Sequence, residues 1–207
     1  MERLSYRALP GVHASPNIRD DPTLYEIENR AADPDGLIEA AMRCITPWDG
    51  RVVLDLGAGT GFHVPRFHAT AEYVFAVEPH DPSRFALMQR TVELGLTNLS
   101  VLKGSAEYLP LRDQRVDICH ARFAYFFAPH CAPGLAELAR VMRLGGTAFL
   151  IDNHLSDGTF ATWLQRAGYV NPEGVMTTAA FWAQHGFAAT TVVTEWRFEQ
   201  REDLEAV

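Results

Sequence analysis

The stretch VVLDLGAGTGF, residues 52–62, joins an apolar run of strand length to an aspartate and three glycines within five positions. Glycine inside a regular element destabilises it by roughly 0.5–1 kcal/mol relative to alanine, so a cluster of glycines needs a backbone reason. A tight strand-to-helix turn needs one glycine and rarely three. The stretch therefore indicates a turn that a ligand approaches closely, at the end of a buried strand.

Around this stretch, apolar segments of strand length alternate with helical segments. The strands are expected at RVVLDL (51–56), YVFAVE (73–78), LSVLKG (99–104), RVDICHA (115–121) and TAFLID (147–152). Helices are expected between them at 63–71, 81–95 and 133–146, and the second of these carries Phe85, Met88 and Val92 on one face. Strands that are apolar on both faces and alternate with helices pair in parallel. The pattern predicts a doubly wound α/β domain, a mostly parallel sheet with helices on both faces.

The flanking segments are predicted to be mainly helical. Two helices are expected before the first strand, at 23–32 and 33–45, each opened by an Asp-Pro pair. After the fifth strand, helices are expected at 159–169 and 179–187, an edge or antiparallel strand at 189–198, and a helix at 199–207. The 207 residues are predicted to form one domain, with N-terminal cap helices (1–48), a cofactor-binding core (49–152) and a C-terminal part (153–207) that completes the sheet and the substrate pocket.

Composition excludes several classes of function. The net charge of −8 argues against a nucleic-acid partner, because phosphate binding needs a basic surface. No secretory signal and no apolar run of membrane-spanning length is evident, so a cytoplasmic protein without a membrane partner is expected. Cys44, Cys119 and Cys131 are scattered, and the eight histidines lack the spacing of metal ligands, so no metal site is expected.

Two acidic residues indicate the kind of ligand. A dinucleotide turn has the form G-x-G-x-x-G, whereas here the third glycine lies four residues after the first. Asp55 would put a carboxylate beside a pyrophosphate, but it suits a ligand with a cationic amine or sulfonium. Glu78, which ends the second strand, can accept both hydroxyls of a ribose. Together the two residues favour a nucleoside ligand that is not a dinucleotide.

With these residues, the chain resembles the class I S-adenosylmethionine (SAM)-dependent methyltransferases. The resemblance rests on four blocks in order, VVLDLGAGTGF, VFAVEP (74–79), GSAEYLPLRDQRVDICHARFAYFF (104–127) and VMRLGGTAFLID (141–152), and covers about 31–152. The chain departs from the family pattern at Ser105, where an acidic residue is usual, and at Leu144, where proline is usual.

The resemblance implies a role for each matched residue. The glycines would form the loop under the methionine part of SAM, Asp55 would contact its amino group, and Glu78 would hold the ribose. The cofactor-binding residues expected on this basis are Tyr25, Asp55, Gly57, Ala58, Gly59, Gly61, Glu78, Pro79, Ser105, Ala106 and Glu107. Tyr25 is included because YEIEN (25–29) resembles an N-terminal cap that closes over SAM. The product would be S-adenosylhomocysteine (SAH).

Methyl transfer from a sulfonium is an in-line displacement in which the enzyme mainly aligns nucleophile and methyl group, worth on the order of 7–11 kcal/mol. A general base is needed only if the acceptor must lose a proton. His154 and His120 are the candidates, since imidazole titrates near neutral pH. The acceptor pocket is expected to contain Arg122, Tyr125, Phe126 and Asn153. Glu26 and Arg30, four apart, are predicted to form an exposed ion pair.

The predicted function is methyl transfer from SAM to a small-molecule acceptor. One alternative is a non-catalytic protein of the same fold, suggested by Ser105 and by the apparent lack of a last strand. The other is a nicotinamide-dependent oxidoreductase, which the glycine spacing and Asp55 disfavour. The acceptor atom and the oligomeric state stay open.

Overall fold

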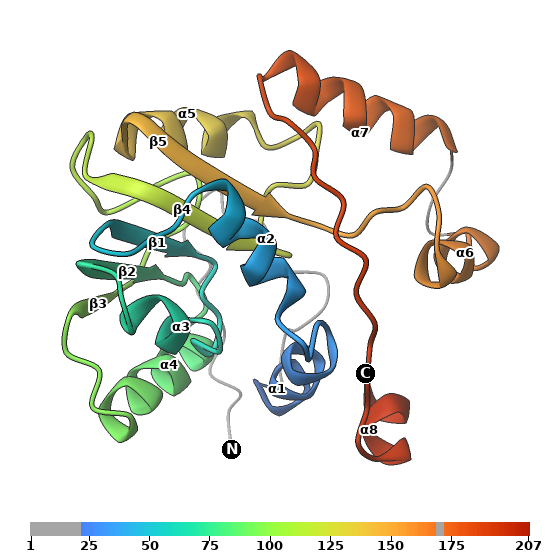
Figure 1. The fold of residues 1–207 in the computed structure, drawn as a ribbon, viewed down its shortest axis with the longest axis horizontal. Helices are drawn as coiled ribbons and strands as arrows, with labels where there is room; N and C mark the ends of the chain where they lie inside the picture. The colour runs from blue at the N-terminus through green and yellow to red at the C-terminus, as the bar shows by residue number, and fades with distance from the viewer. Residues whose placement is uncertain (1–21, 169–171) are drawn as a thin grey trace, which may run out of the picture.

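The computed structural model describes residues 22–168 and 172–207, and its centre is a five-stranded sheet (Figure 1). All strand pairs are parallel, in the order β3-β2-β1-β4-β5. The strands are β1 (Val52–Leu56), β2 (Tyr73–Val77), β3 (Leu99–Leu102), β4 (Val116–Arg122) and β5 (Met142–Ile151). This confirms the doubly wound α/β fold; β1 to β4 lie where the alternating pattern predicts them, and β5 begins five residues before its predicted start at 147.

Helices cover both faces of the sheet. On one face lie α2 (Leu37–Ile45), α3 (Val64–His68) and α4 (Asp81–Glu93), and their buried side chains pack on Val53, Val74 and Ile118 or on Ala76. On the other face, α5 (Ala132–Val141) packs on Leu54 and Cys119. Because side chains alternate along a strand, Asp55, His120 and Arg122 share the face of α2 and α3.

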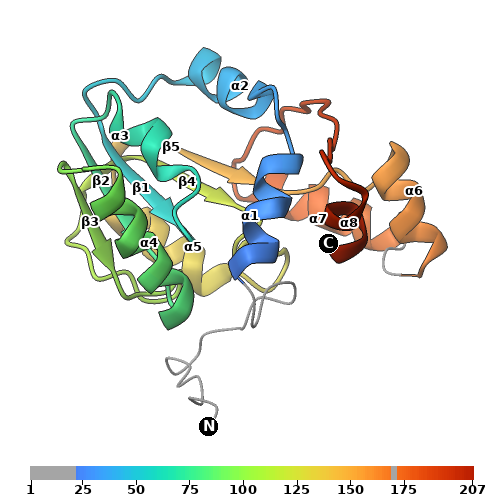
Figure 2. The same cartoon turned by 90° about the horizontal axis from the view of Figure 1, so that it is seen from below.

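Helix α1 (Pro22–Ala31) stands across the ends of the central strands (Figure 2). The connection to α2 is fixed by Asp33, whose two carboxylate oxygens accept the backbone N–H groups of Leu37 and Ile38 at 2.8 and 2.9 Å. The aspartate expected to open the second helix therefore does cap it, but α2 begins at Leu37. The matching aspartate before α1, Asp21, lies outside the described residues.

Two helix predictions need correction. Phe85, Met88 and Val92, expected as one apolar face of α4, are 62%, 50% and 81% exposed, whereas Leu87 is fully buried. Leu87 faces inward because it packs beneath the glycine-rich loop, against Gly61. The helix predicted over 133–146 ends at Val141, and the backbone becomes extended at Met142 to begin β5.

The C-terminal part adds α6 (Thr159–Arg166), α7 (Pro172–Gln184) and α8 (Arg201–Ala206). The strand predicted over 189–198 is wrong, since this segment forms one antiparallel bridge, between Trp196 and Ala32, instead of a ladder with the sheet. It runs beside the α1–α2 connection and does not pair with β5, an edge strand of the sheet. Within residues 22–168 and 172–207, no helix is long and apolar enough to span a membrane. The division at residues 48 and 152 stays a prediction.

Candidate functional site

The glycine-rich loop follows β1 and is closely surrounded. Gly57, Gly59 and Gly61 have φ of 72°, 56° and 79°, in the left-handed region that other residues rarely adopt. A Cβ at Gly57 would lie 2.5 Å from the Cβ of Ala124, and one at Gly59 would lie 2.5 Å from Cε1 of Tyr25. The glycines are therefore needed both for the turn and for the close approach of other groups.

Glu78 holds this loop from the neighbouring strand. Its Oε2 accepts the backbone N–H of Gly59 and its Oε1 accepts that of His80, both at 2.8 Å. The side chain is buried, and burial raises the pKa of its carboxyl group although the two amide hydrogen bonds oppose the shift. Glu78 therefore ties the end of β2 to the turn after β1.

Asp55, on β1, is paired with His120, its direct neighbour in the β1–β4 register. The Nδ1 of His120 lies 2.8 Å from Oδ1 of Asp55, and both side chains are almost fully buried. An ionised carboxylate only accepts, so Nδ1 is the donor; in the neutral form of an imidazole this leaves Nε2 as an acceptor. The second oxygen of Asp55, Oδ2, is buried and has no hydrogen-bond partner in the described part of the chain.

His63, which follows the glycine loop, is buried beside this pair. Its ring centroid lies 5.4 Å from that of His120, and its Nδ1 lies 3.3 Å from Oε1 of Glu39, which also pairs with Arg66. Burial, and after it the charges of the neighbouring His120 and Arg122, lower the pKa of His63 to about 3. The ring is therefore neutral at physiological pH.

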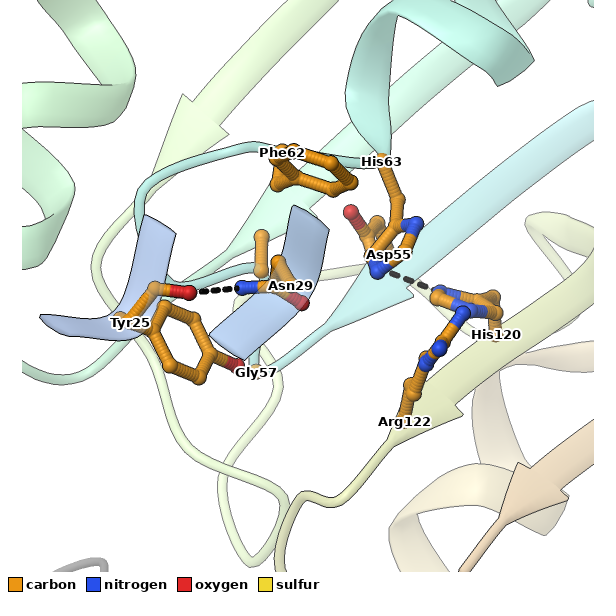
Figure 3. Close-up of a pocket in the computed structure, with 9 residues that line it drawn as sticks. Tyr25, Asn29, Asp55, Gly57, Phe62, His63, His120 and Arg122 are labelled. Atoms are coloured by element: carbon orange, nitrogen blue, oxygen red, sulfur yellow. Dashed lines mark hydrogen bonds and ion pairs between the residues drawn. The ribbon is translucent and has the colours of Figure 1, made fainter. Parts of the chain in front are cut away.

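These groups meet at a small enclosed cavity (Figure 3). Its volume is about 10 Å³, room for roughly one water molecule. It is lined by residues of α1, β1, the glycine loop and β4: Tyr25, Asn29, Asp55, Gly57, Ala58, Phe62, His63, His120 and Arg122. The ring of Tyr25 lies against Gly59, and burial raises the pKa of its phenol far above the ordinary value. Helix α1 thus fills the space over the loop.

Glu26 fastens α1 in this position. Its carboxylate accepts a hydrogen bond from the Thr60 hydroxyl in the glycine loop and one from Nη2 of Arg90 on α4, the latter at 2.7 Å. The predicted exposed ion pair between Glu26 and Arg30 is wrong, because the side chain of Glu26 is 20% exposed and points to the loop and α4 instead.

The predicted cofactor residues are only partly brought together. Tyr25, Asp55, Gly57 and Ala58 line the cavity, and Gly59, Gly61 and Glu78 form the adjoining loop and its support. Pro79 follows Glu78 directly. Ser105 and Ala106, after β3, are buried, and the backbone of Ser105 bonds that of Tyr108. Both carboxylate oxygens of Glu107 are buried without a hydrogen-bond partner among the described residues.

Of the residues predicted for the acceptor pocket, Arg122 alone lines the cavity. Phe126 is buried in the core beneath α5, and Tyr125 packs on Gly134 at the start of that helix, its hydroxyl accepting the Gly134 N–H at 3.2 Å. Both side chains therefore belong to core packing here, where we expected a pocket wall. Their backbone turns away from the cavity after β4, with Phe123 and Tyr125 at φ 51°.

The two candidate bases lie apart. His120 lines the cavity, whereas His154 does not; the latter is half-exposed after β5, beside Ser156 and Asp157. Asn153 adjoins it, and its N–H donates to its neighbour Asp152.

Phe62, Asn29 and His63 line the cavity but are absent from the predicted site. Asn29 shares a helix face with Tyr25, a signal that was available from the sequence. No sequence pattern distinguishes His63, because its place depends on how α3 packs on β4. Over residues 22–168 and 172–207, no group of three or more His, Cys, Asp or Glu side chains is arranged to hold a metal ion.

Comparisons with known proteins agree with this geometry. A family model described as a methyltransferase domain matches residues 54–150. A malonyl-[acyl-carrier protein] O-methyltransferase of Yersinia pestis is 28% identical over 160 residues, 72% of this chain and 56% of the relative. An uncharacterized methyltransferase of Mycobacterium bovis is 34% identical over 113 residues, 55% of this chain and 44% of the relative. The chain thus spans about half the length of the curated relatives it matches.

Among solved structures, a SAM-dependent methyltransferase from Aquifex aeolicus has the same fold. It superposes with a TM-score of 0.63 over 87% of this chain and 95% of its own, at 23% identity. The family model spans the glycine loop, Glu78 and the His120–Arg122 segment, but not Tyr25 and Asn29 of α1, which also line the cavity. Residues 54–150 therefore match a methyltransferase domain, and the chain shares the fold of the Aquifex aeolicus structure.

Proposed function

We propose that this protein binds SAM at the glycine loop and transfers its methyl group to a small-molecule acceptor. The observation that carries the proposal is the placement of two buried carboxylates, Asp55 and Glu78, at the ends of neighbouring parallel strands on either side of that loop. Ligands of doubly wound sheets bind at this edge.

The chemistry of the residues fits SAM. The unpaired Oδ2 of Asp55 is suited to accept from an ammonium group, and burial of this oxygen without a partner is costly until it does. The glycines keep the loop free of side chains, so a ligand can approach its backbone. Glu78 has one backbone N–H on each oxygen, which leaves further lone pairs for ribose hydroxyls.

The cavity in this structure is too small to hold SAM. Pockets for ligands of this size have volumes of about 300–1,000 Å³, whereas the cavity here has about 10 Å³. The ring of Tyr25 occupies the position over Gly59. Binding therefore requires α1 to move away from the loop, and Tyr25 is a cofactor contact only after that movement.

When bound, SAM supplies an electrophilic methyl group on a sulfonium. The chain's own part is to orient the reactants, with the glycine loop and the two buried carboxylates that flank it. Where the acceptor must lose a proton, His120 is the better candidate base, because Asp55 holds Nδ1 as the donor and leaves Nε2 to accept. His154 stays a second candidate, on sequence grounds alone.

Two observations bear on the class of acceptor. The net charge of −8 disfavours nucleic acid, which leaves small molecules as the proposed class. The Yersinia pestis relative is, by its name, an O-methyltransferase of malonyl-[acyl-carrier protein], so carboxylic acids and their thioesters belong among the compounds to test first.

A non-catalytic role is the second candidate, since Tyr25 fills the loop and Ser105 stands where the family usually has an acidic residue. One experiment separates the two. The purified protein is incubated with SAM labelled on the methyl group and a panel of carboxylate, amine, phenol and thiol acceptors, and SAH is measured. Acceptor-dependent SAH formation supports the enzyme. Binding of SAM without turnover on any acceptor class would support the non-catalytic role.

A further inference from the structure

Helix α4, which lies on the outside of the molecule beside β3 (Figure 1), turns an apolar face to solvent. Phe85, Met88 and Val92 on this face are 62%, 50% and 81% exposed. The opposite side of the helix is the packed one, where Ser83 and Leu87 are buried. Single exposed apolar side chains are ordinary, whereas a contiguous group of them is typical of an interaction surface.

The side chains of this face form a groove with the pattern of a helix–helix contact. The groove has a volume of about 310 Å³ and is lined by Phe85, Met88, Gln89, Val92 and Glu93. The first four stand at positions i, i+3, i+4 and i+7 of the helix. In knobs-into-holes packing, a side chain of one helix inserts between four such residues of the facing helix. The groove is therefore suited to a side chain that projects from another helix.

The charges at the two ends of α4 indicate which helix fits. At the N-terminal end, Arg84 and Lys103 both pair with Asp81, so cations outnumber the anion. At the C-terminal end, Glu93 is exposed and forms no ion pair within the part of the chain that the structure describes. The helix dipole has the same polarity, positive at the N-terminus and negative at the C-terminus. Two such helices attract each other when they lie antiparallel, whereas a parallel pair brings like charges together.

We propose that two copies of this chain form a dimer through α4, with the two helices antiparallel about a two-fold axis that passes between Met88 and Gln89. This symmetry sets Phe85 of each copy against Val92 of the other and brings the oppositely charged ends together. A two-fold contact needs a surface that is complementary to itself. The apolar centre and the opposite charges of its two ends give α4 that property.

A membrane surface is the other kind of partner that an apolar helix face can meet. Binding to lipid favours Lys and Arg beside the apolar stripe. Here Gln89 and Glu93 lie beside it, and the net charge of the chain is −8. A second copy is favoured because it matches the apolar centre and both charged ends.

The size of the face indicates a weak dimer. By their exposed fractions, the three apolar side chains offer roughly 300–400 Å² in each copy. Stable interfaces bury about 800 Å² on each partner, and smaller ones belong to transient complexes. We therefore expect dimerisation in the micromolar range. The five groove residues take no part in the cavity beside the glycine loop, so the dimer and the proposed function can fail independently.

Sedimentation equilibrium over a range of protein concentrations tests the proposal. The wild-type protein is expected to dimerise with a Kd of about 10–200 μM. Val92→Glu places two carboxylates in the apolar centre and should raise the Kd at least about tenfold. Val193→Glu, the same change at a valine that is 84% exposed outside this face, is the matched control and should keep the wild-type Kd. Glu93→Lys should raise the Kd about 3- to 10-fold, because like charges then meet at both ends of the contact.

A wild-type protein that stays monomeric up to about 500 μM would overturn the proposal, and this measurement needs no variant. A dimer with the same Kd in Val92→Glu would place the interface elsewhere. Equal weakening by Val193→Glu would show unspecific apolar association instead of a defined contact. Tighter association in Glu93→Lys would contradict the antiparallel arrangement. Binding of the monomer to vesicles of anionic phospholipid, lost in Val92→Glu, would assign the face to a membrane surface.

Discussion

Replacing Glu26 with alanine should increase the affinity for SAH, because Glu26 fastens α1 over the glycine loop. Its carboxylate accepts a hydrogen bond from the Thr60 hydroxyl and another, at 2.7 Å, from Nη2 of Arg90. Hydrogen bonds to charged groups contribute about 1.5–3 kcal/mol net, and exposed ion pairs less than about 1 kcal/mol. With side chains 20% and 25% exposed, the Glu26–Arg90 pair lies between these cases.

Together the two contacts hold α1 in place by about 1–3 kcal/mol. If binding requires α1 to leave, their loss should tighten SAH binding by up to about 5- to 150-fold, at 1.4 kcal/mol per factor of ten. Calorimetric titration of Glu26→Ala measures this directly. Arg30→Ala, on the exposed side of the same helix, is the matched control and should leave the affinity unchanged.

Weaker SAH binding in Glu26→Ala would refute the reasoning, since it would mean that α1 makes the same contacts with the ligand bound. An equal effect of Arg30→Ala would show that the two residues act as the ion pair that the sequence suggests.

Two further predictions concern the loop and its surroundings. Gly61→Ala should lower the free energy of unfolding by about 2–5 kcal/mol, because a positive φ costs about 1–2 kcal/mol and overlap of the new Cβ with Leu87 costs about 1–3 kcal/mol more. Gly95→Ala, at φ 62° in open space, is the control and should show only the cost of the positive φ. Urea unfolding measures both variants, and equal losses would contradict the contact between Gly61 and Leu87. The free energy of unfolding should also fall with acid through His63, whose pKa of about 3 in the folded state lies below that of the unfolded chain. Because the unfolded chain binds the proton first, the contribution of His63 to the free energy of unfolding is complete above pH 6.5 and is lost as the pH falls toward 3, at about 1.4 kcal/mol per pH unit. In His63→Gln the free energy of unfolding should depend less steeply on pH. An unchanged slope would argue against a neutral buried ring.

The sheet could be predicted from the sequence because each of its strands is a short apolar run bounded by turn residues, as in 52–56 and 116–122. The glycine loop and Glu78 could be placed because their positions follow from strand ends. The side of α4 that packs against the rest of the protein could not be predicted. Phe85, Met88 and Val92 have helical spacing, but the side that packs is decided by Leu87 and its contact with Gly61, a long-range fit that no local pattern records.

The same limit applies to the segments around the site. Tyr125 and Phe126 follow β4 where a pocket wall is expected, but positive φ at Phe123 and Tyr125 redirects the chain toward α5. The residues 189–198 have the composition of a strand, yet they lie beside the α1–α2 connection and form no ladder with the sheet. Arg122 was visible as a charge on an apolar strand, whereas its burial in the cavity beside Asp55 and His120 is evident only in three dimensions.

The most direct test of the central claim is calorimetric titration of the wild-type protein with SAH, alongside Glu78→Ala and the exposed control Glu72→Ala. We predict micromolar binding of SAH by the wild type and by Glu72→Ala, with a loss of at least about tenfold in Glu78→Ala, the range of a lost charge-assisted hydrogen bond. Absence of SAH binding to the wild-type protein, or full affinity in Glu78→Ala, would contradict the placement of the cofactor at this loop.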